Sequence, residues 1–255
     1  MILTPQNYFS IEANKKFMSV SQFKAFERCQ TSALAEIKGE YERETTTAML
    51  VGQYVDAYFE GALDKFVSMH PEMFKRDGTL KAEFLQADEI IKRVNRDRLW
   101  MEYATGQQQV IMTGEINGVA VKIMVDSLHP DKIVDRKIVK DFENIYVPEK
   151  GSVPWFEAWG YDTQGAVYQE IVRQNIGKRL PFCLDAATKE KNPDIDIVLM
   201  NQCTLDFALE HFAENIQLYD AIKNGVVVPE RCEKCEYCKM TKVLTQPTDS
   251  NDYYF

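Results

Sequence analysis

The chain reads Val119-Ala-Val-Lys-Ile-Met-Val-Asp126, then Ser127-Leu-His-Pro-Asp-Lys132, then Ile133-Val-Asp-Arg-Lys-Ile-Val139. The first run is apolar and β-branched, the middle has turn chemistry, and the last reads as a second strand, so the stretch predicts a β-hairpin. Asp135 and Lys137 are two residues apart and share one strand face, whereas Val134 and Ile138 face the core on the other. An acid and an ammonium therefore lie next to the strand end that carries Asp126, and two carboxylates can hold a hard divalent ion.

The spacing of Asp126 and Asp135-Arg136-Lys137 resembles the signature of the PD-(D/E)XK nucleases, with Val125 where that superfamily often has proline. The resemblance implies that Asp126 and Asp135 bind one or two Mg²⁺ or Mn²⁺ ions and that the Arg136 carbonyl is a further ligand. It also implies that Lys137 orients or deprotonates the attacking water. The alternative interpretation of an Asp-x-Lys motif is a surface salt bridge on an edge strand.

A second motif lies between Trp155 and Gly177, where the apolar spacing predicts a helix. Gln164 and Tyr168 are four residues apart and therefore stack on one helical face. They resemble the Gln-x-x-x-Tyr motif of the RecB, AddB and RecE nuclease branch, which implies a position beside the active site and DNA. The alternative is an ordinary tyrosine in an amphipathic helix.

Upstream, the run from Thr47 to Glu60 resembles the Gly-x-x-x-His helix of the same family, whose histidine binds metal, but here the position holds Asp56. A carboxylate is a harder donor than imidazole and suits magnesium or manganese at least as well. The resemblance thus implies Asp56 as a metal ligand, and a solvated aspartate is the alternative. Glu115 is a further candidate ligand that fits equally well as a surface residue.

Cys232, Cys235 and Cys238 place three thiols within seven residues, and Cys29 lies far upstream. Such a run is a strong metal signal, although four thiolates suit zinc as well as an iron-sulfur cluster. The arrangement resembles AddB and the four-cysteine CRISPR adaptation nucleases, which implies a [4Fe-4S] cluster joining the two ends of the fold. Reduced thiols near a chain end are the alternative, and Cys183 and Cys203 are expected to be small core residues.

The chain has 255 residues, 45% of them hydrophobic, and this predicts one α/β domain with a sizeable core. No basic region followed by an apolar run begins the sequence, and no segment is long and apolar enough to span a bilayer, so we expect a cytoplasmic protein without a membrane partner. The net charge of −9 argues against nucleic-acid binding, which rests largely on cationic contacts to phosphate, unless a local basic surface holds the DNA; ordinary solvated helix faces are the alternative for such residues. Lys92-Arg93, Arg96, Arg98 and Lys178-Arg179 are candidates for that surface.

Periodicity and turn signals predict the order of the elements. Helices are expected over 19–38, 46–68, 79–103, 155–177 and 205–224, and strands over 182–188, 195–202 and, as a three-stranded meander with an Asn117-Gly118 turn, 110–139. The result is a mixed α/β fold of the restriction-endonuclease type, with a central mixed sheet flanked by helices and an N-terminal helical segment. We expect a single domain over 1–244 and a flexible tail over 245–255.

The resemblance implies a RecE-like exonuclease of the kind carried by phages and prophages. Its expected activity is Mg²⁺- or Mn²⁺-dependent, 5′-to-3′ hydrolysis of linear double-stranded DNA during phage-type recombination. Its expected partners are DNA, a single-strand annealing protein and further copies of the chain. The alternatives are a nuclease-fold DNA-binding subunit with weak activity and a zinc-stabilised interaction module.

Overall fold

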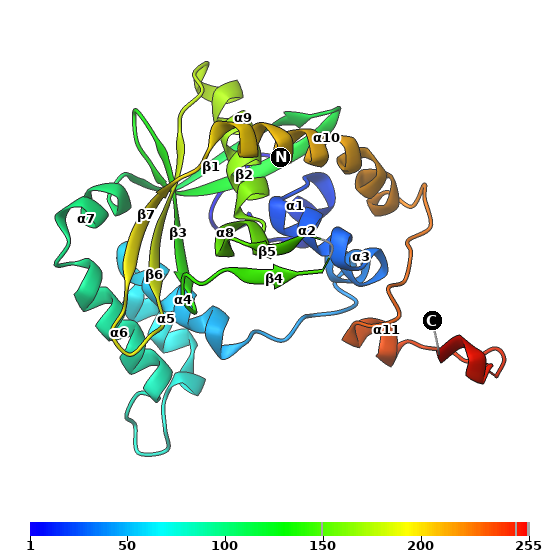
Figure 1. Cartoon of the computed structure of the whole chain (residues 1–255), viewed down its shortest axis with the longest axis horizontal. Coiled ribbons are helices and arrows are strands. Elements are labelled where there is room, and N and C mark those ends of the chain that lie inside the picture. Colours follow the sequence, from blue (N-terminus) through cyan, green and yellow to red (C-terminus); the bar gives the residue numbers. More distant parts are fainter. Residues whose placement is uncertain (149, 248, 254–255) are drawn as a thin grey trace.

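The structure, a computed structural model, describes residues 1–148, 150–247 and 249–253. A five-stranded sheet stands between two layers of helices (Figure 1). Its strand order is β1-β2-β3-β6-β7, antiparallel except where β3 pairs with β6. The predicted mixed sheet flanked by helices is confirmed.

The strands follow the hydrophobic pattern of the sequence. They are β1 (Gln107–Ile116), β2 (Val119–Leu128), β3 (Ile133–Val139), β6 (Phe182–Thr188) and β7 (Ile195–Leu199), and a separate hairpin is formed by β4 (Ile145–Val147) and β5 (Gly151–Val153). Asn117 and Gly118 join β1 to β2 with φ angles of 47° and 77°. Both are positive, as a type I′ hairpin turn requires. The predicted meander is therefore present.

One helical layer contains α1 (Ile11–Lys16), α2 (Val20–Arg28), α3 (Gln30–Lys38), α8 (Trp155–Ala158), α9 (Tyr161–Ile176) and α10 (Gln202–Lys223). The other contains α4 (Thr47–Phe59), α5 (Leu63–Met69), the 3₁₀ turn η1 (Pro71–Met73), α6 (Ala82–Val94) and α7 (Arg98–Ala104). Near the C-terminus, α11 (Glu236–Met240) lies beside α3 and is followed by η2 (Ser250–Tyr253) (Figure 1).

Each helical layer forms its own hydrophobic core with one face of the sheet. Leu184 and Ala186 of β6 pack with the α2, α9 and α10 side, and Ala187 packs with the α4 to α7 side. All seven residues of β6 are buried. Because both faces of the central strands are covered, any charged side chain on β3 or β6 has to find its partners inside the protein.

Four of the predicted helices are interrupted, so the prediction of continuous helices there is wrong. Cys29 adopts extended backbone between α2 and α3, and Asp97 begins α7 by accepting a hydrogen bond from the amide of Trp100. Gly61 and Gly160 have φ angles of 67° and 66° and end the preceding helices. These conformations stop a helix although the apolar spacing continues across them.

Other boundaries and burials also differ from expectation. β7 ends at Leu199 and α10 begins at Gln202, because the side chain of Asn201 caps that helix. Cys183 is buried as predicted, but Cys203 is exposed, so the prediction that it is a core residue is wrong. Cys203 lies in the first turn of α10, and this helix directs Leu205 rather than Cys203 toward the core.

The tail predicted over 245–255 contains η2 within its described residues, while positions 248, 254 and 255 lie outside them. Its flexibility stays a prediction, as does the single-domain boundary at 244. Among the described helices, none combines the length and apolar character that crossing a membrane requires.

Candidate active site

The candidate site lies where β2 and β3 stop pairing. Only Ser127 with Val134 and Leu128 with Ile133 are paired, and the next pair in that register would be Asp126 with Asp135. There the Oδ2 atom of Asp126 accepts a hydrogen bond from the Arg136 amide at 3.0 Å, as a β2 carbonyl would in a continuing ladder. The two acids are therefore brought together by the register of the hairpin.

The N-terminal segment occupies the edge of β2 that β3 leaves free. The Met18 amide donates to the Ala120 carbonyl at 2.8 Å, and the Lys122 amide donates to the Met18 carbonyl at 2.9 Å. This backbone pairing keeps β3 away from the first half of β2. A pocket of about 300 Å³ opens between the two strands.

All five predicted catalytic residues line this pocket: Asp126, Asp135, Lys137, Gln164 and Tyr168. Asp135 is only 1% exposed, and its Oδ1 atom accepts a hydrogen bond from Nε2 of Gln164 at 2.7 Å. Its Oδ2 atom forms an ion pair with the Lys137 ammonium. The Tyr168 hydroxyl donates to the Met124 carbonyl at 3.0 Å and so ties α9 to β2.

β3, which carries Asp135 and Lys137, lies in the middle of the sheet. The alternative interpretation of the Asp-x-Lys motif, a surface salt bridge on an edge strand, is therefore wrong.

The side chain of Arg136 extends from β3 toward the α4 to α7 layer. Its Nε atom lies 3.3 Å from Oδ2 of Asp185, its Nη1 atom lies 3.8 Å from Oδ1 of Asp56, and its guanidinium lies 3.9 Å from the centre of the Phe59 ring. Asp185 on β6 is fully buried and is in register with Arg136. One arginine thus links a buried acid to an acid that lines the pocket.

Asp56 reaches the same pocket from α4, and its side chain is 36% exposed. Its Oδ1 atom is buried and has no hydrogen-bond partner within the described part of the chain. The alternative of an ordinary solvated aspartate therefore does not describe it. Apart from its 3.8 Å ion pair with Arg136, this oxygen makes no hydrogen bond to a described residue, and such a carboxylate oxygen on a pocket with two further carboxylates suits a hard divalent cation.

The carboxylate oxygens of Asp56, Asp126 and Asp135 nevertheless do not all come within 4.8 Å of one another; among the described residues only the cysteines form such a group. Arg136 beside Asp56 and Lys137 beside Asp135 neutralise part of the negative charge. Like charges that close together would otherwise repel.

Burial sets the pKa values of these groups. It raises the pKa of Asp135 to about 7, although the Lys137 ammonium opposes the shift, and raises the pKa of Asp185 to about 6 against the opposing charge of Arg136. It raises the pKa of Asp56 well above its usual range, and the charge of Asp126 adds to the shift. Burial lowers the pKa of Lys137, but Asp135 and Asp126 outweigh it, so this pKa is raised and the ammonium stays charged.

Several residues at or behind the pocket were not found from the sequence. They include Tyr8, Lys24 and Lys122, which line it, Gln109, whose amide lies 3.3 Å from Asp126, and Asp185. A single acid in the otherwise apolar run Phe182–Thr188 is a signal that marks Asp185. The predicted candidate Glu115 is exposed and does not line the pocket, in keeping with a surface residue.

The four predicted cysteines converge on one place. The Sγ atom of Cys238 lies 3.6 Å from that of Cys29 and 4.0 Å from that of Cys232, and all four sulfurs lie within 4.8 Å of one another. The Cys235 amide donates to Sγ of Cys232 at 3.3 Å, and the Cys238 amide donates to Sγ of Cys235 at 3.4 Å. The break between α2 and α3 allows Cys29 to reach this group.

Comparison with known families finds that residues 19–241 match the family described as a PDDEXK-like domain of unknown function (DUF3799). A solved crystal structure described as a "Putative exonuclease" from Eubacterium rectale is 46% identical, with a TM-score of 0.96 over 99% of this chain and 98% of that one. Comparison with curated proteins finds no match.

Proposed function

The chain belongs to this PDDEXK-like family and is a PD-(D/E)XK nuclease, and from that premise we propose that it is a metal-dependent DNA exonuclease acting on linear double-stranded DNA. The main support for this proposal is that Asp126, Asp135 and Lys137 line one pocket at the point where β2 and β3 separate. The description of the Eubacterium rectale protein as an exonuclease supports the choice of exonuclease.

Asp126, Asp135 and Asp56, with the Arg136 carbonyl, would hold magnesium or manganese. When bound, a divalent ion of this kind lowers the pKa of water and neutralises charge at phosphorus. The Oδ1 atom of Asp56 makes no hydrogen bond among the described residues, and this supports its assignment as a ligand in place of the family's histidine. The Arg136 side chain would hold Asp56 toward the pocket, since its guanidinium is fixed by Asp185 and Phe59.

Lys137 is suited to offset the charge that develops on the phosphate and to orient the attacking water. Its raised pKa supports these tasks over that of general base. Gln164 fixes the carboxylate of Asp135 through one oxygen, and the Arg136 amide fixes that of Asp126. Tyr168 sets the distance between α9 and β2 through its bond to Met124. The pocket is thus held in shape by hydrogen bonds among α9, β2 and β3.

The test is digestion of linear duplex DNA labelled at either end, with and without Mg²⁺. We expect metal-dependent loss of the labelled strand from its 5′ end, and Asp135→Ala and Lys137→Ala should abolish it while the circular dichroism spectrum is unchanged. Lys140→Ala is the matched control, because Lys140 directly follows β3 but its side chain is 94% exposed. Near-normal activity of both active-site variants would refute the proposed site, and DNA binding without cleavage would favour the non-catalytic DNA-binding subunit.

The resemblance to RecE-like enzymes also leads us to propose a role in phage-type recombination in the cytoplasm, with a single-strand annealing protein as partner and possible self-association. Co-purification of the chain with the annealing protein encoded nearest to it tests the partner. Light scattering tests the oligomeric state. Neither measurement depends on the active site.

We further propose that Cys29, Cys232, Cys235 and Cys238 hold a resident metal group. The family resemblance supports a [4Fe-4S] cluster, in which each thiolate binds a different iron. The sulfur separations of 3.6 and 4.0 Å support a single zinc ion, because tetrahedral bonds of about 2.3 Å place sulfurs about 3.8 Å apart. Metal analysis and the visible absorbance of protein purified without oxygen separate the two groups. Zinc without any nuclease activity would favour the interaction-module alternative.

A further inference from the structure

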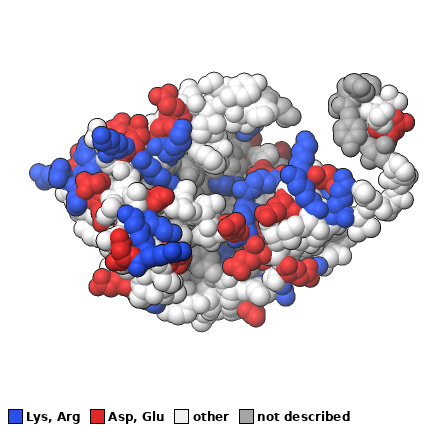
Figure 2. Space-filling model, turned by 90° about the horizontal axis from the view of Figure 1, so that it is seen from below, with Lys and Arg blue, Asp and Glu red and all other residues white. Residues whose placement is uncertain are grey.

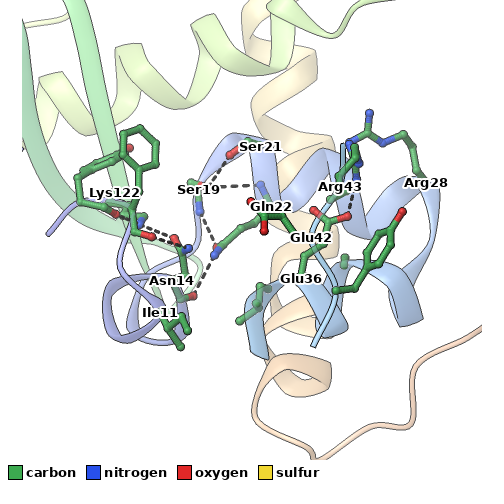
Figure 3. Close-up of a pocket in the computed structure, with 16 residues that line it drawn as sticks. Ile11, Asn14, Ser19, Ser21, Gln22, Arg28, Glu36, Glu42, Arg43 and Lys122 are labelled. Carbon is green, nitrogen blue, oxygen red and sulfur yellow. Dashed lines mark hydrogen bonds and ion pairs between the residues drawn. The ribbon is translucent and has the colours of Figure 1, made fainter. Parts of the chain in front are cut away.

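A groove continues from the active-site pocket along the N-terminal part of the protein. The next cavity, of about 480 Å³, shares Tyr8, Phe9, Ser19, Ser21 and Lys122 with the active-site pocket (Figure 3). A third cavity, of about 270 Å³, shares Ala25, Arg28, Tyr41 and Arg43 with the second and reaches Cys29 and Cys235. These shared residues place the three cavities next to one another, in a row from the carboxylates to the cysteine group.

One wall of the groove is held in place by a buried lysine. The Lys122 ammonium donates to the Tyr8 carbonyl and, at 2.7 Å, to Oδ1 of Asn14, while Nε2 of Gln22 donates to the Asn14 carbonyl at 3.0 Å (Figure 3). Lys122 is only 1% exposed, and this burial lowers its pKa to about 8. Burying an ammonium costs free energy unless hydrogen bonds compensate for the lost water, so moving the segment that contains Tyr8 and Asn14 away from Lys122 would be unfavourable. The backbone of Tyr8 is thereby held at the junction of the two cavities, next to Phe9.

The junction presents an aromatic ring to solvent. Phe9 is 70% exposed, and its ring meets that of Tyr8 edge to face with centroids 4.9 Å apart. An exposed ring at the mouth of a polar pocket is a platform on which a nucleic-acid base can stack. The hydroxyls of Ser19 and Ser21, 3.0 Å apart, lie on the same groove and can donate to phosphate oxygens.

The far end of the groove carries two arginines. Arg43 pairs with Glu36 at 2.6 Å, whereas Arg28 has no ion pair among the described residues. Partial burial and then the charge of Arg43 lower the pKa of Arg28, while the charges of Glu36 and Glu27 oppose the shift. Because Arg28 has no ion pair of its own within that part of the chain, its guanidinium can bind a further anion. Glu42 also lines this end, so Arg28 has to supply most of the attraction.

The overall charge of −9 does not prevent such a contact. On the face of the molecule seen in Figure 2, lysine and arginine side chains lie beside a central hollow, with acidic side chains mixed among them. The candidate basic residues Lys92 and Arg179 are paired with Glu89 and Asp206 instead, and neither lines the active-site pocket.

We propose that this groove binds a single DNA strand extending from the active site, with a base stacked on Phe9 and a phosphate held by Arg28 and Arg43. The inference rests on the proposed nuclease function and adds the path of its substrate. Pockets that enclose small ligands measure about 300–1,000 Å³, and nucleotides of one strand are of that size whereas a duplex is not. Continuity with the carboxylates favours DNA over a protein segment as the occupant.

The test is the affinity of the full chain for a fluorescein-labelled oligothymidylate, measured by anisotropy with Ca²⁺ in place of Mg²⁺ to prevent cleavage. Base stacking is worth about 1–3 kcal/mol, so Phe9→Ala should weaken binding about five- to 150-fold and Phe9→Trp should restore it. Arg28→Glu should weaken binding and reduce the slope of log affinity against log salt by about 0.7, the value for one phosphate contact to a single strand. Phe207→Ala and Arg98→Glu are matched controls, because both residues are exposed and lie outside the groove.

If Phe9→Ala and Arg28→Glu both bind the oligonucleotide with an affinity within about twofold of that of the parent chain, the proposed path is wrong. The same result is expected if a protein segment, rather than DNA, occupies the groove. The same preparations are assayed for degradation of duplex DNA with Mg²⁺. Degradation by the parent chain together with unchanged single-strand binding by the variants would refute the groove alone. Absence of degradation by the parent chain would refute the proposed function instead.

Discussion

Replacing Arg136 by methionine should destabilise the protein strongly, because it leaves Asp185 without a partner. Both side chains are buried, and their closest atoms are 3.3 Å apart. Asp185 has no hydrogen bond to either carboxylate oxygen within the described residues, so this ion pair is its main compensation. Methionine can still fill part of the volume above Phe59 but carries no charge.

Breaking a buried pair on one side costs about 3–5 kcal/mol, whereas replacing both partners by apolar residues is often neutral. We therefore expect Arg136→Met to lower the free energy of unfolding by that amount, and Arg136→Met with Asp185→Leu to recover most of it. With a urea dependence of about 3 kcal/mol per molar, the single change moves the midpoint by about 1–1.7 M.

The loss should depend on pH. Burial raises the pKa of Asp185 to about 6 from a usual value of 3.8, so its contribution to stability falls as pH rises through this window and is constant above it. Arg136 opposes that rise, and without it the folded pKa is higher still. The destabilisation by Arg136→Met should therefore be small at acidic pH, where Asp185 is protonated, and largest at alkaline pH.

Urea denaturation of the parent chain and of the single and double variants, at acidic and alkaline pH, measures these differences. Arg173→Met is the control, since Arg173 pairs with Glu170 at 2.7 Å but is 47% exposed, and its loss should cost less than about 1 kcal/mol. A single variant no less stable than this control, or a double variant as unstable as the single one, would refute the reasoning.

Three further changes test other parts of the structure. A Cβ at Gly165 would lie 2.5 Å from Phe182, so Gly165→Ala should cost about 1–3 kcal/mol in thermal denaturation, and a stabilised variant would contradict the close packing of α9. Because the pKa of Asp135 is about 7 and a ligand has to be deprotonated, Mn²⁺ affinity measured by calorimetry should fall up to about tenfold per pH unit below 7; a flat profile argues against Asp135 as a ligand. Cys29→Ser should make the segment after Pro229 sensitive to limited proteolysis, with the cleavage sites read by mass spectrometry; an unchanged cleavage pattern would show that the segment docks without the cysteine group.

The sequence by itself determined the parts of the protein that depend on neighbours along the chain. Alternating apolar residues and the Asn117-Gly118 turn defined the β1-β2 hairpin, and the motif of Asp126, Asp135 and Lys137 located the candidate site. The cysteine run indicated the metal-ligating group before its geometry was known. These signals are local, because strand periodicity, turn chemistry and ligand spacing act over a few residues.

Only the tertiary structure decided how these parts meet. The insertion of Met18 beside β2, the burial of Lys122 under Tyr8 and the pairing of Asp185 with Arg136 join residues 49 to 114 positions apart. The apolar spacing of the sequence continues across Cys29 and Gly160, although the chain leaves the helix at both residues. The break at Cys29 brings its thiol to the cysteine group, and the break at Gly160 directs α9 toward the pocket. Whether a charged side chain is buried, and with which partner, depends on packing between layers, and that is not encoded in any short stretch of the chain.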